Sequence, residues 1–260
     1  MSTPSSSPMP LEQTPELSQP ALSEPARIIN TFVAPSKTFM DIRRNASWWV
    51  PWLLGTVIFM GFMYTVEKKI GWEAVVNYQM SHASFMQRLT AQMPPEQKQI
   101  FMDKQIAGAH RRIYTTPIVG LIFYLIFAAL LMATFNFGFG SKIKFKTALA
   151  VLSYGWLPRI VTAIVSMIVL AVGVEPEGFD MENPITTHLG VLLGSNTDSR
   201  YLYHVLSGID IISIWWVCLV GLGFAIVSER KISKGAAITA VAAWYVVGTL
   251  LRVAITPFGG

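Results

Sequence analysis

The apolar segment at residues 147–173 constrains the fold more than any other part of the sequence. About 20 apolar residues in an α-helix are enough to cross a hydrocarbon core roughly 30 Å thick, so this segment is predicted to span a membrane. It is interrupted near its middle by Gly155, Pro158 and Arg159. These residues predict a bend in the helix and place a charge near the middle of the bilayer.

Four other segments have the same apolar character, and the whole chain is 52% apolar and only 13% charged. This composition is far from that of a soluble domain and predicts an integral membrane protein. The expected fold is all-α, a polytopic membrane bundle of five transmembrane helices. The spans are expected at about residues 48–66, 117–137, 147–173, 209–227 and 235–255.

The chain before the first span is expected to form two parts. Residues 1–26 are rich in proline and serine and lack the pattern of a secretory signal, so they are predicted to be a disordered tail. Residues 27–47 combine arginines with apolar residues at helical spacing, which predicts a juxtamembrane amphipathic segment. This segment either anchors the topology or binds an anionic lipid or a protein partner. The five-span membrane domain is then expected at residues 48–258.

The connection between the first and second spans is long enough to have structure of its own. Apolar residues recur every three or four positions on both sides of Pro94 and Pro95. This pattern predicts an extra-membrane helical hairpin that is broken at the two prolines. The apolar stripes of the hairpin could cover the mouth of the bundle, bind a partner or pack against each other.

Positive charges are concentrated in two short loops. Residues 138–146 and 228–234 hold six cations in sixteen positions, whereas residues 67–116 and 174–208 hold eight in eighty-five. Because short basic loops stay on the cytoplasmic side, the N-terminus is predicted to be cytoplasmic and the C-terminus non-cytoplasmic. The expected location is the cell (inner or plasma) membrane.

Three charged residues fall inside the predicted spans, where a charge is costly and indicates a candidate site. Counting along the helices places Arg159 near the midplane and both Asp210 and Arg252 near the outer side, so Asp210 is predicted to pair with Arg252. Arg159 would snorkel, bind a carbonyl freed by Pro158, or reach toward Asp210. These three charged residues form either a polar crevice for an anionic ligand or a lipid headgroup, or a buried ion pair that fixes the register of the helices.

The sequence offers no group that predicts catalysis. The four histidines are scattered outside the spans, one intramembrane aspartate cannot form a carboxylate dyad, and Cys218 is the only cysteine. We therefore expect no catalytic, cofactor-binding or metal-binding residues. Nucleic-acid binding is not expected either, because the basic residues flank apolar spans.

Several short motifs follow one another along the chain: Pro35 to Phe39, Trp48 to Pro51, Tyr154-Gly155-Trp156-Leu157-Pro158, Asp210 to Trp215, and Lys231 to Gly235. In this order they resemble the prokaryotic branch of the Yip domain family of Yip/Yif-type multi-pass membrane proteins. The resemblance implies five spans and a cytoplasmic N-terminus. Eukaryotic members bind Rab-type GTPases, but their aspartate-leucine-tyrosine-glycine-proline element is missing here, so GTPase binding is not expected.

Two functions remain open at this point. The first is a noncatalytic scaffold that organises the membrane or binds a partner, with the lipid bilayer and a membrane or cytoplasmic protein as its contacts. The second is a small transporter or channel with a polar crevice at Pro158, Arg159 and Asp210.

Overall fold

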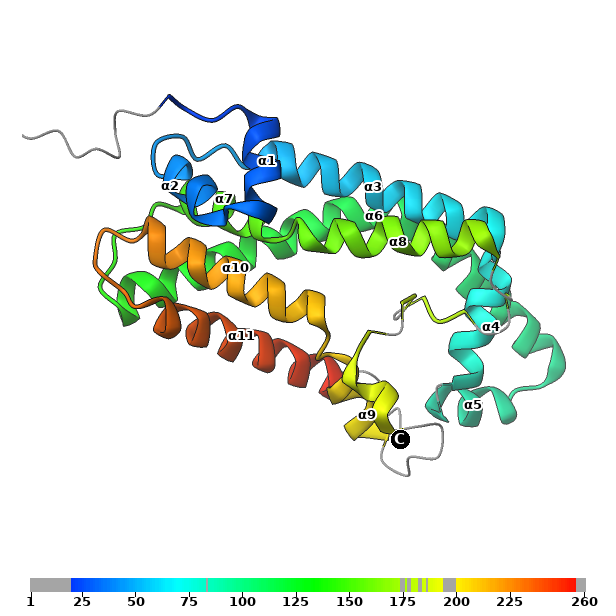
Figure 1. Ribbon diagram of the computed structural model, residues 1–260. Coiled ribbons are helices and arrows are strands. Elements are labelled where there is room, and N and C mark those ends of the chain that lie inside the picture. The colour runs from blue at the N-terminus through cyan, green and yellow to red at the C-terminus, as the bar shows by residue number, and fades with distance from the viewer. Residues whose placement is uncertain are drawn as a thin grey trace, which may run out of the picture.

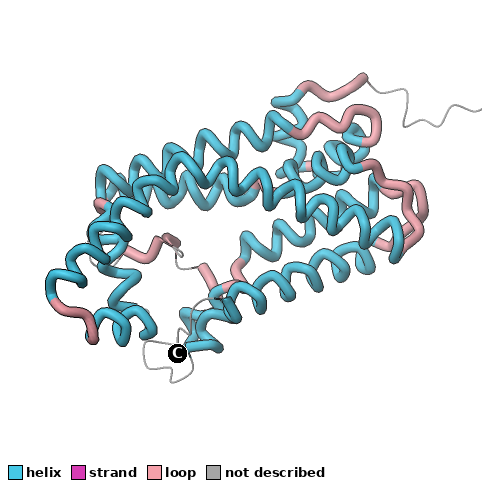
Figure 2. Tube along the Cα trace, turned by 180° about the vertical axis from the view of Figure 1, so that it is seen from behind, coloured by secondary structure: helices cyan, strands magenta, loops and turns pink. Residues whose placement is uncertain are grey.

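The computed structural model describes residues 20–82, 84–173, 176, 179–181, 184–185, 187–193 and 200–255. This part of the chain is helical and contains no β-strand (Figure 2). Most of the predicted tail lies in residues 1–19, outside the described residues. The first helix already begins at Glu24, three residues before the predicted amphipathic segment.

The α-helices are α1 (Glu24–Val33), α2 (Pro35–Ile42), α3 (Trp49–Lys69), α4 (Trp72–His82), α5 (Ser84–Ala91), α6 (Pro95–Ala133), α7 (Phe145–Gly155), α8 (Pro158–Val172), α9 (Arg200–Ser207), α10 (Ile211–Val227) and α11 (Lys234–Ile255). A π-helical turn, Thr134–Gly138, extends α6, and a 3₁₀-helix covers Leu189–Leu193.

Four stretches of the described chain are long and apolar enough to cross a membrane: Trp49–Lys69, Pro95–Gly138, Phe145–Val172 and Lys234–Arg252. They run along the long axis of the molecule together with the shorter apolar helix α10 (Figure 1). Large apolar side chains cover their outer surfaces, and Phe123 on α6 is 66% exposed. Such a surface needs lipid as its solvent, so the chain is a multi-pass membrane protein.

The predicted interruption of the third apolar segment is present. Helix α7 ends at Gly155 and α8 begins at Pro158, which occupies the first turn of the new helix, where a missing N–H is tolerated. Gly155 also permits close contact with α10, because a Cβ at this position would lie 2.5 Å from Cγ2 of Val220. The break is therefore held in place by both the proline and its packing.

The separate hairpin predicted between the first two spans is not confirmed. The chain does break at the prolines, since α5 ends at Ala91 and α6 begins at Pro95. However, α6 continues for 39 residues through Pro117 into the apolar segment, a length of roughly 58 Å. A proline within a helix is tolerated where neighbouring helices support it, and α4 and α3 both pack against α6.

Helices α1 and α2, which we call the cap, close one end of the bundle (Figure 1). The cap packs on α7 and α10, and its Phe39 and Ile42 are fully buried in the larger apolar core. The predicted amphipathic segment is thus two helices, of which α2 buries Phe39 and Ile42 in the protein while Ile29 and Val33 of α1 stay exposed. A second core lies at the opposite end, which we call the far end, where α3, α4, α6 and α8 meet.

Candidate functional site

A polar cluster joins α8, α10 and α11 halfway along the bundle, and we call it the node. Nη2 of Arg159, at the second position of α8, donates to Oγ of Ser213 over 3.1 Å. Ser213 Oγ donates in turn to Oδ2 of Asp210. Asp210 is the N-cap of α10, and its Oδ1 accepts from the backbone N–H of Ile212 at 2.8 Å and of Ser213 at 2.9 Å. One carboxylate therefore caps the helix and anchors the arginine through a serine.

Two aromatic residues complete the node. The hydroxyl of Tyr245 lies 2.8 Å from Ser213 Oγ and also within hydrogen-bonding distance of the Gly208 carbonyl. The guanidinium carbon of Arg159 lies 4.9 Å from the ring centroid of Trp156, which is a cation–π contact. Nε of Arg159 is buried without a hydrogen-bond partner. The positive charge is thus shared between an aromatic face and a serine-bridged carboxylate.

The node lies near the middle of two of its three helices. Arg159 is near the middle of the Phe145–Val172 stretch, and Tyr245 is near the middle of α11. Asp210 is at the start of α10, which begins within two residues of the fourth span expected at 209–227. The 17 residues of α10 place Asp210 about 26 Å from the cap end of that helix.

The predicted pairing of Asp210 with Arg252 is wrong. Among the described residues, the carboxylate of Asp210 accepts its hydrogen bonds within the first turn of α10, and none of the ion pairs found there joins it to Arg252. Arg252 follows Tyr245 by seven residues, about 10 Å further along α11. Of the three predicted arrangements for Arg159, the reach toward Asp210 is the one observed, with Ser213 as the link.

A second polar cluster fixes the cap to the bundle. Arg27 is only 1% exposed, and its Nε lies 2.6 Å from Oδ2 of Asp41, which is 2% exposed. Nη1 of Arg27 is 3.3 Å from Oε1 of Glu24, and Arg44 approaches the other oxygen of Asp41 at 3.1 Å. The hydroxyl of Tyr154 on α7 donates to Oε2 of Glu24. These contacts connect α1, α2 and the helix that precedes the break.

The charge of Arg27 is maintained by its partners. Burial lowers the pKa of Arg27, but the hydrogen bonds and charges of Asp41 and Tyr154 raise it, and the net shift is upward. The guanidinium therefore stays charged at every physiological pH. An arginine that is buried and charged needs its acid, so the cap depends on Asp41.

The two short basic loops meet beside the cap. Oγ of Ser141 and Oγ of Ser228 are 2.7 Å apart in a buried hydrogen bond that joins the α6–α7 loop to the α10–α11 loop. The basic residues of the two loops and of the helix starts that follow them are all exposed, and we call them the basic rim: Lys142, Lys144, Lys146, Arg230, Lys231 and Lys234.

A family model for the Yip1 domain matches residues 29–255, which is most of the chain. The chain belongs to the Yip1 domain family. The match covers the second half of α1, all of α2, the break at Pro158 and the node, and it begins after Glu24 and Arg27. Neither the curated proteins nor the solved structures include a match to this chain.

For this Yip1 domain protein, the described residues contain no cluster of three or more histidine, cysteine, aspartate or glutamate side chains able to hold a metal ion. The members of the Yip1 domain family are membrane proteins, and the family is not known as enzymatic. The chemistry available in the node and the cap is hydrogen bonding and ion pairing between helices.

Sequence reasoning singled out Tyr154, Gly155, Pro158, Arg159, Asp210 and Arg252, and the structure brings Arg159 and Asp210 together. The sequence-based prediction missed Ser213 and Tyr245 in the node and the Glu24–Arg27–Asp41 cluster in the cap. A signal for this contact existed, because an aspartate directly before an apolar run is typical of a helix N-cap, and an N-cap at Asp210 puts Ser213 at the third position of the helix, within reach of the carboxylate. No local signal pairs Arg27 with Asp41, since that contact depends on how α1 and α2 fold together.

Proposed function

We propose that this Yip1 domain protein is a noncatalytic five-span scaffold that organises the membrane or binds a protein partner through its cap end. The observation that carries this proposal is the hydrogen bond between Ser141 and Ser228, which unites two basic loops into one surface beside the docked cap. A fixed, exposed set of like charges is a binding surface for acidic groups on a partner or a membrane.

The fifth span in this proposal is α10. Its 17 residues extend about 26 Å, slightly less than a hydrocarbon core. It packs on α2, α7, α8 and α11, so much of its surface is covered by protein. The polar groups at its start are satisfied within the node. A short helix of this kind is tolerated because the polar groups at its start are hydrogen-bonded within the protein, while the exposed side chains beside them, Ile211 and Ile214, are apolar.

We place the basic rim and the N-terminus in the cytoplasm, with the protein in the cell membrane, because short basic loops are retained on that side. A reporter inserted next to Lys144 is expected to be cytoplasmic, and one fused after Gly260 is expected to be non-cytoplasmic. Enzymatic reporters active on one side of the membrane only would measure this. The reverse pattern would refute the orientation and, with it, a cytoplasmic docking surface.

Recovery of partners from native membranes tests the scaffold role. The rim variant exchanges Lys142, Lys144, Arg230 and Lys231 for glutamine. The matched control makes the same exchange at four exposed basic residues in the first half of α6, away from the basic rim: Lys98, Lys104, Arg111 and Arg112. After crosslinking and quantitative mass spectrometry, we expect a specific partner whose recovery falls at least about fivefold with the rim variant alone. Absence of a specific partner, or an equal loss with both variants, would contradict the proposal.

The transporter alternative is not favoured. The family match supports a membrane protein without pointing to transport, and the main polar groups at Pro158, Arg159 and Asp210 bond to one another across three helices. Such mutual bonding supports a role in fixing helix register.

A further inference from the structure

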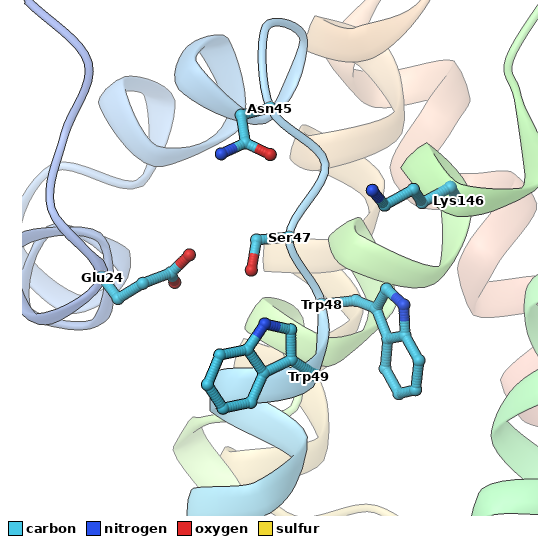
Figure 3. Close-up of a pocket in the computed structure, with 6 residues that line it drawn as sticks. All are labelled: Glu24, Asn45, Ser47, Trp48, Trp49 and Lys146. Atoms are coloured by element: carbon cyan, nitrogen blue, oxygen red, sulfur yellow. The ribbon is translucent and has the colours of Figure 1, made fainter.

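A pocket of about 420 Å³ opens at the cap end, where the first apolar helix begins. It lies between the start of α1, the connection from α2 to α3, the start of α3 and the first turn of α7. Six residues line it: Glu24, Asn45, Ser47, Trp48, Trp49 and Lys146 (Figure 3). Its volume is within the range of small-molecule sites.

The pocket carries one negative and one positive group. Figure 3 shows the Glu24 carboxylate and the Lys146 ammonium on opposite sides, both turned toward the space between them. The ion pairs among the described residues do not include Lys146. Each oxygen of Glu24 accepts one internal hydrogen bond, from Arg27 or from Tyr154, and keeps a second lone pair. The pocket therefore offers an acceptor and a cation to one zwitterionic guest.

The pocket lies at the depth where lipid headgroups are expected. Trp48 and Trp49 begin α3, and tryptophans favour the depth where headgroups meet acyl chains. From Trp49 onward, an exposed apolar stripe continues along α3, formed by Leu53, Val57, Met60 and Tyr64. Their spacing of three and four residues puts them on one face of the helix. This stripe gives acyl chains a path from the pocket toward the bilayer centre.

We propose that this pocket binds the phosphoethanolamine headgroup of a membrane phospholipid. The primary ammonium donates hydrogen bonds to Glu24, while the phosphate meets Lys146 with donors from Ser47 and Asn45. A choline headgroup has no N–H to donate to the carboxylate, and a glycerol headgroup brings no cation to it. The proposal goes beyond the scaffold role and does not rest on it.

Native mass spectrometry of the full-length protein, with phosphatidylethanolamine, phosphatidylcholine and phosphatidylglycerol of identical acyl chains in equal amounts, tests this site. We expect the ethanolamine lipid to be retained about tenfold over the other two, as one charge-assisted hydrogen bond implies. Lys146→Gln should reduce its retention about tenfold, whereas Lys37→Gln, on the exposed side of α2 and outside both the pocket and the basic rim, should not change it. Glu24→Gln should abolish the preference over phosphatidylglycerol.

Three results would overturn the assignment. They are equal retention of the three lipids by the unmodified protein, equal effects of the Lys146 and Lys37 variants, and displacement of the lipid by free phosphoethanolamine at the same concentration. The last would show that the site takes a soluble zwitterion and not a lipid. The rim variant of the scaffold test leaves Lys146 unchanged. The scaffold role and the lipid site can therefore be refuted independently of each other.

Discussion

Arg27 is the most deeply buried charge in the described chain, and its position shows how the cap is held. A buried guanidinium is stable only while its acid is present, so the cap behaves as one unit with Asp41 and Glu24. Thr38 on α2 reinforces the unit by donating to the carbonyl of Arg27 over 2.9 Å.

Replacement of Asp41 by asparagine should destabilise the protein strongly. The variant removes the buried carboxylate 2.6 Å from Arg27 and leaves only the more exposed Glu24 at 3.3 Å, a change that costs about 3–5 kcal/mol. Thermal unfolding of the purified protein in detergent measures it. Asp103→Asn on the exposed surface of α6 is the control and should leave the midpoint unchanged. The double variant Arg27→Met with Asp41→Leu should recover most of the loss, and failure to recover would show that the ion pair is not the cause.

Ser213 should be essential to the node because Arg159 reaches Asp210 only through its hydroxyl. Ser213→Ala is expected to cost about 1–3 kcal/mol, since buried donors of Arg159 and Tyr245 lose an acceptor. A double-mutant cycle with Arg159→Met isolates the pair and should give a coupling of at least about 0.5 kcal/mol. Additive effects of the two substitutions would mean that Arg159 is held by Trp156 alone.

At the scale of the elements, α10 organises the membrane part of the molecule, because it contacts the cap, both halves of the broken helix and α11. Its glycines permit this. A Cβ at Gly221 would lie 2.5 Å from Cα of Ile238, so the backbones of α10 and α11 are in direct contact there. Close packing of this kind holds helices together where lipid supplies no hydrophobic drive between them.

Gly221→Ala should therefore push α11 away from α10 and destabilise the protein by about 1–3 kcal/mol. Gly248→Ala is the matched control, since an added Cβ on that side of α11 meets nothing within 4 Å. The control should be neutral or raise the unfolding midpoint slightly, because alanine favours a helix by about 1 kcal/mol over glycine. If both variants lower the midpoint equally, the cause is not the α10–α11 contact.

The element boundaries show which features the sequence determines locally. The start of α3, the break at Gly155 and Pro158, and the course of α11 agree with prediction, because long apolar runs and prolines act on their own segment. The start of α10 at Ile211 also agrees with the span expected at 209–227, whereas the continuity of α6 through Pro117 disagrees, because it depends on neighbouring helices. The partners in the node were missed for the same reason, since a count along one helix cannot reveal which side chain of another helix it meets.

At the scale of the whole molecule, a belt of exposed apolar side chains surrounds the bundle between the cap and the far end. Cys218 is the only cysteine of the chain, and it is exposed on α10 between the node and the cap end. It thus reports directly on whether this belt is in contact with lipid or with water.

In native membranes, Cys218 should react with a charged, impermeant maleimide at least about tenfold more slowly than a cysteine placed at Lys144 in a Cys218→Ser background. Thiols react as thiolates, and a thiolate is disfavoured in hydrocarbon. Unfolding in detergent and denaturant should make Cys218 fully reactive. Equal rates in intact membranes would contradict the position of α10 within the bilayer.

The packing of α2 on α10 determines when the protein can be completed during synthesis. Phe39 of α2 lies so close to α10 that a Cβ at Gly223 would be 2.9 Å from its ring. The two residues are 184 positions apart (223 − 39), so at roughly 5–20 residues per second α2 waits about 9–37 seconds for its partner. During that interval Phe39 and Ile42 lack their final cover, although they lie at the front of the chain. The cap is made first and docks late, so its docking requires that α10 has been synthesised and has joined the bundle.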